Sequence, residues 1–354
     1  MVVDDSAVIR GLVSRTLEQE PDIEIVASAP DGRAAVAAIG RTPADVVVLD
    51  IEMPVMDGLT AIPLLLQAAP GVRILMASTL TAKNAQITLD ALAAGATDFL
   101  LKPSAVREML GTASFNQELL TKVRELGPRP ARGPTKTSRK PAADTSSSPA
   151  AQDAAGLSLR QAPMLPPEVL AIGSSTGGPQ ALLQVLTGVA KNVRVPIVIT
   201  QHMPPTFTAI LAAQIKRQSG LAAVEAQEGM PLEPGHVYVA PGDFHMTVDA
   251  VHVIHLNQGP RENFCRPSVD PMLRSLVGVY RSRVLTVILT GMGHDGLAGC
   301  KAVIEAGGAV IAQDEATSVV WGMPGAVAKA GLCSAVLPLA EIGLRLRPYV
   351  SGEI

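Results

Sequence analysis

Short apolar runs alternate with amphipathic stretches throughout the first third of the chain. Runs this uniformly apolar are typical of strands covered on both faces, and the stretches between them have helical spacing. The pattern therefore predicts repeated βα units in a doubly wound parallel sheet over residues 1–126. The runs are MVV (1–3), IEIVASA (23–29), DVVVLD (45–50), RILMAS (73–78) and DFLLK (98–102), and the helical stretches include SAVIRGLVSRTLEQ (6–19) and KNAQITLDALAAG (83–95).

The pattern breaks at residues 127–167 and resumes at 168–354. The intervening segment is rich in Pro, Ser, Ala and Gly and has no hydrophobic period, so we interpret it as a flexible linker. Residues 168–354 again alternate strands and helices, which predicts a second α/β domain. Its predicted strands are EVLAIG (168–173), VPIVITQH (195–202), HVYVAPGD (236–243), AVHVIHL (250–256), VLTVILTG (284–291), AVIAQD (309–314) and SAVLP (334–338), and AVHVIHL alternates as an antiparallel ribbon would.

Composition agrees with two buried cores and narrows the class of protein. The 354 residues are 47% hydrophobic and 17% charged, with a formal net charge of −3 and only 3% aromatic residues. A chain without excess cations or stacking aromatics is a poor nucleic-acid binder. Three isolated cysteines favour the reducing cytoplasm, and no apolar run is long enough to cross a bilayer. We therefore expect a cytoplasmic protein with no nucleic-acid partner and no membrane insertion.

Polar residues follow the predicted strands of the first domain. Asp4 and Asp5 follow the first strand, Asp50 the third, Ser78 the fourth, and Lys102 ends the fifth. Ligands bind at the carboxyl edge of such sheets, and carboxylates gathered there favour a shared Mg²⁺. Asp50 is then the candidate phosphoryl acceptor, with Lys102 and Ser78 contacting the new group. Singly, each residue fits a helix cap or a solvated lysine better; jointly they favour a site.

The second domain contains a serine in the pattern Gly173-x-Ser175-x-Gly177, between a predicted strand and a helix. Such a turn exposes a serine hydroxyl at the sheet edge, and the helix N-terminus directs N–H groups toward a developing oxyanion. The same glycine-rich turn could instead cradle a phosphate, so the motif alone leaves the two alternatives even.

A nucleophilic serine requires a base and an orienting carboxylate. His202 ends a buried strand and is the best-placed base, His245 is the second choice, and His294 is expected to face elsewhere. Asp295 follows another buried strand in a glycine-rich loop and is the candidate carboxylate. With Ser175 these residues favour a triad, whose chain order differs from that of α/β-hydrolases. Scattered histidines make a catalytic metal less favoured.

The first domain resembles a response-regulator receiver. The similarity lies in VVDDS, VVVLDIEMPVMDG, the serine of MAST, and LLKP. It implies a flavodoxin-like fold, phosphorylation of Asp50 by a chemotaxis histidine kinase, Mg²⁺ held by Asp4, Asp5 and Asp50, and switching through Ser78 and Lys102. Because only three residues precede Asp4, we expect a short first strand that holds the metal ligands less firmly.

The second domain resembles the chemotaxis protein-glutamate methylesterases. The similarity lies in IGSSTGG, TQHMPP, YVAPGDFHM, RPSVD, ILTGMGHDG and AQDEATSVVWGMP. It implies a Rossmann-like fold, a triad of Ser175, His202 and Asp295, Thr176 beside the nucleophile, the Met292 N–H in the oxyanion hole, and no catalytic cofactor. The implied substrates are methylated chemoreceptors, whose glutamines would also be deamidated. We expect the unphosphorylated first domain to cover the catalytic edge.

Two other classes of protein compete with this interpretation. In the first, the second domain only binds a partner or nucleic acid; it would then fail to react with a fluorophosphonate at Ser175. In the second, the glycine-rich turn binds a nucleotide, and binding would be saturable.

Overall fold

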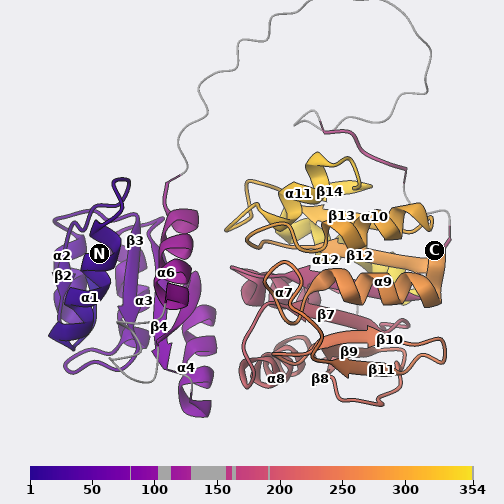
Figure 1. The fold of residues 1–354 in the computed structure, drawn as a ribbon, viewed down its shortest axis with the longest axis horizontal. Helices are drawn as coiled ribbons and strands as arrows, with labels where there is room; N and C mark the ends of the chain where they lie inside the picture. The colour runs from indigo at the N-terminus through magenta and orange to yellow at the C-terminus, as the bar shows by residue number, and fades with distance from the viewer. Residues whose placement is uncertain (80, 103–112, 129–156, 162–164, 190–191, 353–354) are drawn as a thin grey trace, which may run out of the picture.

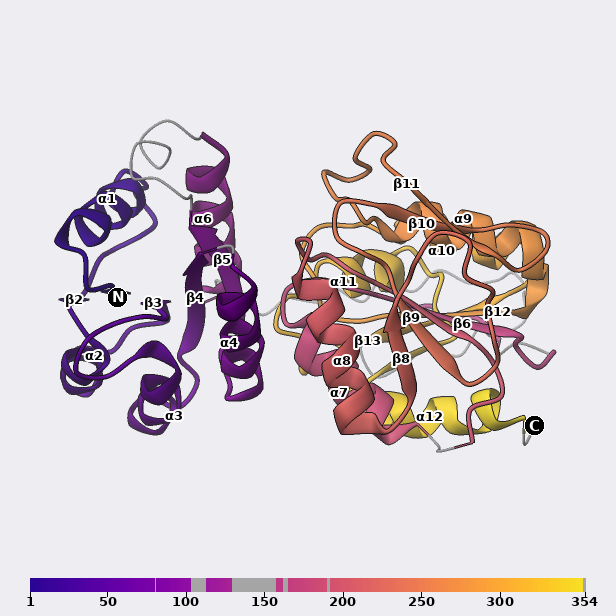
Figure 2. The same ribbon diagram turned by 90° about the horizontal axis from the view of Figure 1, so that it is seen from below.

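The computed structural model describes the chain except residues 80, 103–112, 129–156, 162–164, 190–191 and 353–354. Two α/β lobes lie side by side, each built on its own parallel sheet (Figures 1 and 2). This confirms the predicted fold class of two doubly wound parallel sheets with a small antiparallel ribbon.

The first lobe has a parallel five-stranded sheet in the order β2-β1-β3-β4-β5, which is the flavodoxin-like order. Helices α1 to α4 each begin after a residue whose side chain caps the helix. For example, Asp57 caps α3 by accepting a hydrogen bond from the Thr60 N–H. The elements are β1 (Val2–Val3), α1 (Ala7–Glu18), β2 (Ser28–Ala29), α2 (Gly32–Ile39), β3 (Val46–Asp50), α3 (Gly58–Ala68), β4 (Arg73–Thr79), α4 (Ala82–Ala93), β5 (Asp98–Lys102) and α6 (Ala113–Leu126).

The predicted strand 23–29 is wrong over most of its length. Because β1 contains only Val2 and Val3, it pairs with β2 at Ser28 and Ala29 alone. Ala27 O still accepts a 3.1 Å hydrogen bond from Val2 N, whereas residues 23–26 lie beyond the end of β1 and are not in a strand. A cavity of about 470 Å³ lies there, beside Met1. The predicted short first strand is confirmed. The Met1 ammonium donates a 2.9 Å hydrogen bond to Val46 O, and burial lowers its pKa to about 6.

The second lobe has a parallel seven-stranded sheet in the order β14-β13-β12-β6-β7-β9-β8, and the predicted antiparallel ribbon is confirmed as β10 paired with β11. Of the predicted ribbon strand 250–256, residues 250–252 lie instead in the turn between these two strands. The short edge strand β8 was not predicted. The elements are β6 (Val169–Ser174), α7 (Gly178–Gly188), β7 (Ile197–Gln201), α8 (Phe207–Ser219), β8 (Ala222–Glu225), β9 (His236–Val239), β10 (His245–Val248), β11 (Ile254–Asn257), α9 (Val269–Tyr280), η1 (Arg281–Arg283), β12 (Val284–Ile288), α10 (Leu297–Glu305), β13 (Ala309–Gln313), α11 (Met323–Lys329), β14 (Ala335–Leu337) and α12 (Leu339–Ser351).

The direction of strand order reverses at β6, which lies between β7 and β12. In doubly wound sheets, the loops at such a switch point diverge to opposite faces and leave a crevice beyond the carboxyl ends of the strands. The loops after β6, β7 and β12 carry Ser175, His202 and Asp295, respectively. The fold therefore gathers these three residues at one edge.

The lobes contact each other through α4 and β5 on one side and α7 and α8 on the other (Figures 1 and 2). The rings of Phe99 and Phe207 stack with centroids 4.7 Å apart. Gln180 Nε2 donates to Ala96 O at 2.6 Å and also to Leu92 O. This contact is therefore both apolar and polar.

The predicted linker 127–167 lies mostly outside the described residues. In its described part, the Arg160 N–H donates a 2.8 Å hydrogen bond to Cys333 O, which joins this part of the chain to the second lobe. The domain boundaries given above remain our proposal.

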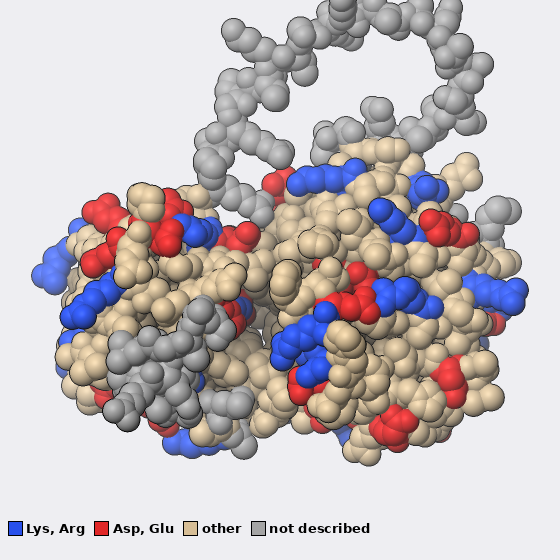
Figure 3. All heavy atoms as spheres, in the orientation of Figure 1, with Lys and Arg blue, Asp and Glu red and all other residues tan. Residues whose placement is uncertain are grey.

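On the face drawn in Figure 3, basic and acidic side chains of the described residues are interspersed. No helix among the described residues is long and apolar enough to span a membrane.

Candidate functional site

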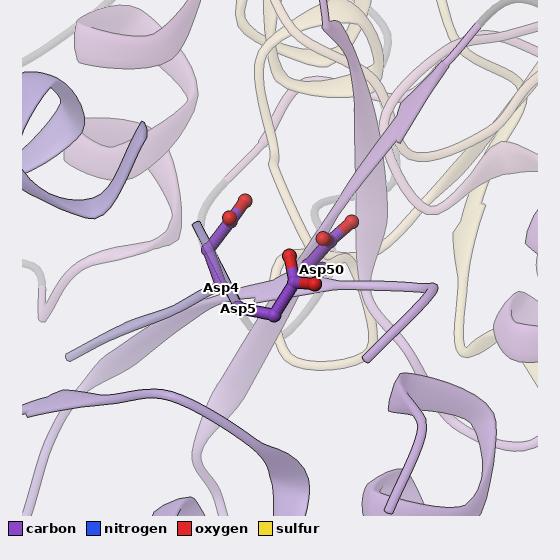
Figure 4. Close-up of side chains that lie close together, drawn as sticks. All are labelled: Asp4, Asp5 and Asp50. Atoms are coloured by element: carbon purple, nitrogen blue, oxygen red, sulfur yellow. The ribbon is translucent and has the colours of Figure 1, made fainter. Parts of the chain in front are cut away.

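The acidic edge of the first lobe consists of Asp4, Asp5 and Asp50. Each offers a carboxylate oxygen, and these oxygens lie within 4.8 Å of one another, in the arrangement seen in Figure 4. Asp4 and Asp50 are nearly buried, whereas Asp5 is exposed. A set of hard oxygen donors this close together fits one Mg²⁺ that keeps part of its water shell. The structure thus brings together the three residues that the sequence predicted.

Lys102 joins this group, and Ser78 lies near it on the neighbouring strand. Lys102 Nζ is 2.6 Å from Asp4 Oδ2 and 2.6 Å from Asp50 Oδ1. The buried Ser78 hydroxyl donates to Thr79 O at 3.3 Å and accepts a 2.9 Å hydrogen bond from Thr88. Lys102 is therefore in place to contact a group on Asp50, while Ser78 is hydrogen-bonded away from that carboxylate.

The electrostatics of the acidic edge oppose full ionisation. Burial raises the pKa of Asp50, and the charge of Asp4 adds to that effect, whereas Lys102 acts against it. A cation at this edge would relieve the same cost, which agrees with the fit of the three carboxylates to Mg²⁺.

In the second lobe, Ser175 lies on a tight turn between β6 and α7. The turn needs glycine twice: Gly177 has φ +74°, and a Cβ at Gly178 would lie 2.1 Å from Gln201 Oε1. Gln201 holds the turn from the neighbouring strand end, since its amide donates to Ser175 O at 2.9 Å. Ser175 is partly exposed. The local sequence thus presents the hydroxyl at the sheet edge, as predicted.

His202 follows the adjacent strand and pairs with Asp295. The register aligns Ser174 with Gln201, so Ser175 and His202 are the next residues on neighbouring parallel strands. His202 Nε2 is 2.7 Å from Asp295 Oδ2. His202 Nδ1 lies 3.4 Å from Cys265 Sγ, and no described residue is hydrogen-bonded to Ser175 Oγ. The imidazole is therefore oriented by Asp295 but directed at Cys265 in this state.

Asp295 is 1% exposed and is hydrogen-bonded on both oxygens. Two of its donors are N–H groups at the start of α9, where the helix dipole favours a negative charge. The donors other than His202 are Ser268 Oγ (2.7 Å), Val269 N (2.7 Å), Asn263 Nδ2 (2.8 Å), Gly296 N (2.9 Å) and Asp270 N (3.3 Å). This carboxylate is fixed in position and in its ionised form.

The two partners shift each other's pKa in the direction that a catalytic pair requires. Burial would lower the pKa of His202, but its bonds to Asp295 and Cys265 raise it above the ordinary value. Burial would raise the pKa of Asp295, but His202 and the surrounding donors hold it well below its usual range. The site therefore favours the charged imidazolium that forms when histidine accepts a proton.

Among the described residues, neither of the two other candidate histidines pairs with Asp295 or Ser175. His245, the second-choice base, is 3% exposed, accepts from Ser268 N at 3.2 Å and lies 2.9 Å from Pro260 O. His294 is exposed, as expected from its position beside Asp295. These placements leave His202 as the histidine at the serine edge.

Thr176 and Met292 both lie at the serine turn. A Cβ at Gly291 would be 2.9 Å from Ser175 Cβ, which places the start of the Met292 loop against Ser175. Thr176 Oγ1 donates to Asp98 Oδ2 of the first lobe at 2.9 Å, and Lys122 Nζ is 2.5 Å from the same oxygen. A carboxylate of the first lobe thus binds the residue next to Ser175.

Sequence reasoning missed Cys265, Asn263 and the Asp98–Thr176 contact. Cys265 and Asn263 precede RPSVD in an irregular loop, so no periodicity predicts that they fold back onto His202 and Asp295. RPSVD itself belongs to the similarity with the methylesterases, and its serine and valine supply two of the Asp295 donors.

Comparisons with known proteins assign a family to each lobe. The CheB methylesterase family matches residues 170–346, and the response regulator receiver domain matches residues 1–114. A protein-glutamate methylesterase/protein-glutamine glutaminase of group 2 operon from Rhodospirillum centenum is 56% identical over 97% of this chain and 91% of the relative. A protein-glutamate methylesterase/protein-glutamine glutaminase from Azospirillum brasilense is 55% identical over 99% of this chain and 92% of the relative.

Among solved structures, the Thermotoga maritima CheB methylesterase catalytic domain aligns with a TM-score of 0.50 and 42% identity. The alignment covers 51% of this chain and 98% of that domain. The chain therefore belongs to the CheB methylesterase family, in the form that carries a response-regulator receiver domain ahead of the esterase domain.

Proposed function

We propose that this chain hydrolyses γ-glutamyl methyl esters on the cytoplasmic helices of chemoreceptors, releasing methanol, and that phosphorylation of Asp50 activates it. The observation that carries the proposal is the 2.7 Å contact between His202 and Asp295, beside the serine turn and at the switch point of a sheet of this family. The names of the relatives supply glutamate methyl esters and glutamines of proteins as the substrate class, and the chemoreceptor follows from the resemblance to the chemotaxis methylesterases.

In the proposed reaction, Ser175 Oγ attacks the ester carbonyl carbon while its proton passes to His202. The oxyanion collapses, the C–O bond to the methoxy group breaks, and His202 gives the proton to departing methanol. Water then attacks the glutamyl-enzyme with His202 as base, which restores Ser175 and leaves a glutamate. Asp295 orients the ring throughout. Since Nε2 faces Asp295, Nδ1 is the atom that carries the proton, and it must leave Cys265 to reach Ser175.

The oxyanion would be stabilised at the turn. The Met292 N–H belongs to the loop beside Ser175, and Thr176 is the adjoining residue on the turn. The same attack on a glutamine amide would release ammonia instead of methanol, which accounts for deamidation in the same site. The mechanism uses no cofactor in this domain.

In the receiver, Asp4, Asp5 and Asp50 would hold Mg²⁺, which supplies charge neutralisation for phosphoryl transfer. The Asp50 carboxylate accepts the phosphoryl group from a phosphohistidine of a chemotaxis histidine kinase. Lys102, already 2.6 Å from Asp50, pairs with the phosphoryl oxygens, and Ser78 exchanges its contact with Thr79 for one to the new group.

The receiver restrains the esterase in the unphosphorylated state. Asp98 binds Thr176 next to the nucleophile, and the Phe99–Phe207 stack and the Gln180 bonds hold the lobes together around that point. Phosphorylation shifts the population toward an arrangement in which these contacts are broken. The chain thus acts in the cytoplasm on methylated chemoreceptors, with no nucleic-acid partner and no membrane insertion.

Methanol release from membranes that carry methylated chemoreceptors tests the proposal. Release should occur with the full chain, increase with a small phosphodonor, and vanish in Ser175→Ala. Asp50→Ala should keep basal release and ignore the phosphodonor. Release that persists in Ser175→Ala would overturn the assignment of the nucleophile, and no release from the wild-type chain would overturn the proposed function.

A further inference from the structure

Phe264 is the most exposed large apolar side chain among the described residues. It is 93% exposed, whereas Phe99, Phe115 and Phe207 are buried. In a chain with only five phenylalanines, an aromatic ring left in solvent contributes nothing to the core.

The backbone at Phe264 makes this placement still less favourable for folding. Glu262 and Cys265 exchange hydrogen bonds, with Cys265 N to Glu262 O at 2.8 Å and Glu262 N to Cys265 O at 3.2 Å. The two residues between them, Asn263 and Phe264, have φ values of +51° and +64°. This pattern is that of a tight turn of type I′, in which asparagine followed by glycine is favoured. Phenylalanine at such a φ is strained, so folding does not explain its presence.

The turn of residues 262–265 is fixed against the catalytic residues. On one side of Phe264, Asn263 Nδ2 donates to Asp295 Oδ1 at 2.8 Å; on the other, Cys265 Sγ is 3.4 Å from His202 Nδ1. Glu262 at the base of the turn is paired with Arg274 at 2.6 Å. Phe264 therefore extends from a rigid base at the rim of the active site, one residue from the contact with the catalytic base.

We propose that Phe264 is a docking residue that packs against apolar side chains of the receptor helix carrying the scissile ester. This inference rests on the proposed function. A substrate side chain on a helix is flanked by others three and four residues away, about one turn along the axis. When the ester reaches Ser175, such neighbours pass the rim, where a rigid ring covers them at low entropic cost. A small ester has no such neighbours and gains nothing from the ring.

The test compares two substrates across four full-length proteins: wild type, Phe264→Ala, Phe264→Gly and Phe264→Tyr. Alanine removes the ring but keeps a strained side chain at positive φ, whereas glycine removes both ring and strain. On methylated receptor membranes, kcat/KM should fall about tenfold in the alanine and glycine variants, chiefly through KM, and stay near wild type in the tyrosine variant. On p-nitrophenyl acetate, all four proteins should be equal.

Thermal unfolding supplies the second readout. The glycine variant should have a higher Tm than wild type, by about 1–4 °C, while turning over receptors more slowly. A loss of equal size on both substrates would show that the turn only shapes the active site. Receptor turnover unchanged in Phe264→Ala would exclude docking. If wild-type protein releases no methanol from receptors, the proposed function itself fails, and this inference fails with it.

Discussion

The receiver and the esterase domain both place carboxylates at the carboxyl edge of a parallel sheet, but they treat them in opposite ways. Asp295 accepts hydrogen bonds from five neighbouring donors in addition to the His202 pairing. Among the described residues, Asp50 has two partners, Lys102 and the Ile51 N–H, and it shares Lys102 with Asp4. The protein thus fills the hydrogen-bonding positions around the Asp295 carboxylate, whereas the Asp50 carboxylate keeps acceptor positions that a ligand can use.

The pKa shifts of the two groups follow from this difference. Burial raises the pKa of Asp50 because its partners only partly offset the lost hydration. Asp295 is more deeply buried than Asp50, yet its pKa lies well below the usual range because His202 and the surrounding donors outweigh burial. In the proposed mechanism, Asp295 orients a base and profits from a fixed charge. In the same proposal, Asp50 accepts a metal and a phosphoryl group, so it has to keep free coordination sites.

The largest expected effect comes from replacing the Asp295 carboxylate with a neutral amide. Asp295→Asn keeps the shape but places an amide NH₂ among donors, so the ring of His202 loses its orientation. Turnover should fall on the order of 10⁴. Asp50→Asn, the matched change at the acidic edge of the receiver, should leave basal turnover within about twofold, because Asp50 does not contact the esterase site. Methanol release without a phosphodonor measures both. Equal losses of turnover in the two variants would contradict the difference between Asp295 and Asp50 described above.

A smaller effect is expected at the contact between the receiver and the esterase domain. Asp98→Ala removes the acceptor that holds Thr176, a hydrogen bond to a charged group worth about 1.5–3 kcal/mol, and the lower end of that range is roughly tenfold in the population of closed molecules. Basal turnover should rise by up to about tenfold, and activation by the phosphodonor should shrink by the same factor. The measurement is methanol release with and without phosphodonor.

Gln180→Ala provides the control from the other side of the contact, since it removes the bonds to Leu92 and Ala96 without altering the receiver. It should change basal turnover in the same direction and by less. If both variants leave basal turnover unchanged, the docked arrangement does not restrain the enzyme.

The sequence predicts the strand ends well because buried parallel strands are uniformly apolar and side chains at their carboxyl ends share an edge. Asp4, Asp50, Ser175 and His202 all follow from that rule. It fails for residues 23–27, where the run has strand composition but β1 is too short to pair with it. Strand formation there depends on a neighbour, not on local propensity.

The loop before α9 was beyond prediction for a different reason. Asn263 and Cys265 reach Asp295 and His202 through a turn with two positive φ values. Neither Phe264 nor Cys265 is a residue type whose presence predicts such a turn. The Asp98–Thr176 bond joins residues 78 positions apart across two domains, a contact that no local pattern records.

Cys265 is the site of the smallest predicted effect, because it contacts the imidazole of His202 and makes no hydrogen bond with the Asp295 carboxylate. Its thiol lies 3.4 Å from His202 Nδ1 and helps to raise the pKa of His202. Only the neutral imidazole can accept the Ser175 proton, so a raised pKa moves the rising limb of the kcat/KM profile to higher pH. Cys265→Ala should lower that pKa, move the limb to lower pH, and increase kcat/KM near pH 7 about two- to fivefold by freeing Nδ1.

Cys265→Ser, which keeps a hydrogen-bonding group, should lie between alanine and wild type. Cys300→Ala, a buried thiol elsewhere, should leave the limb in place. A limb that moves to higher pH in Cys265→Ala would mean that the thiol assists the base instead of competing for it.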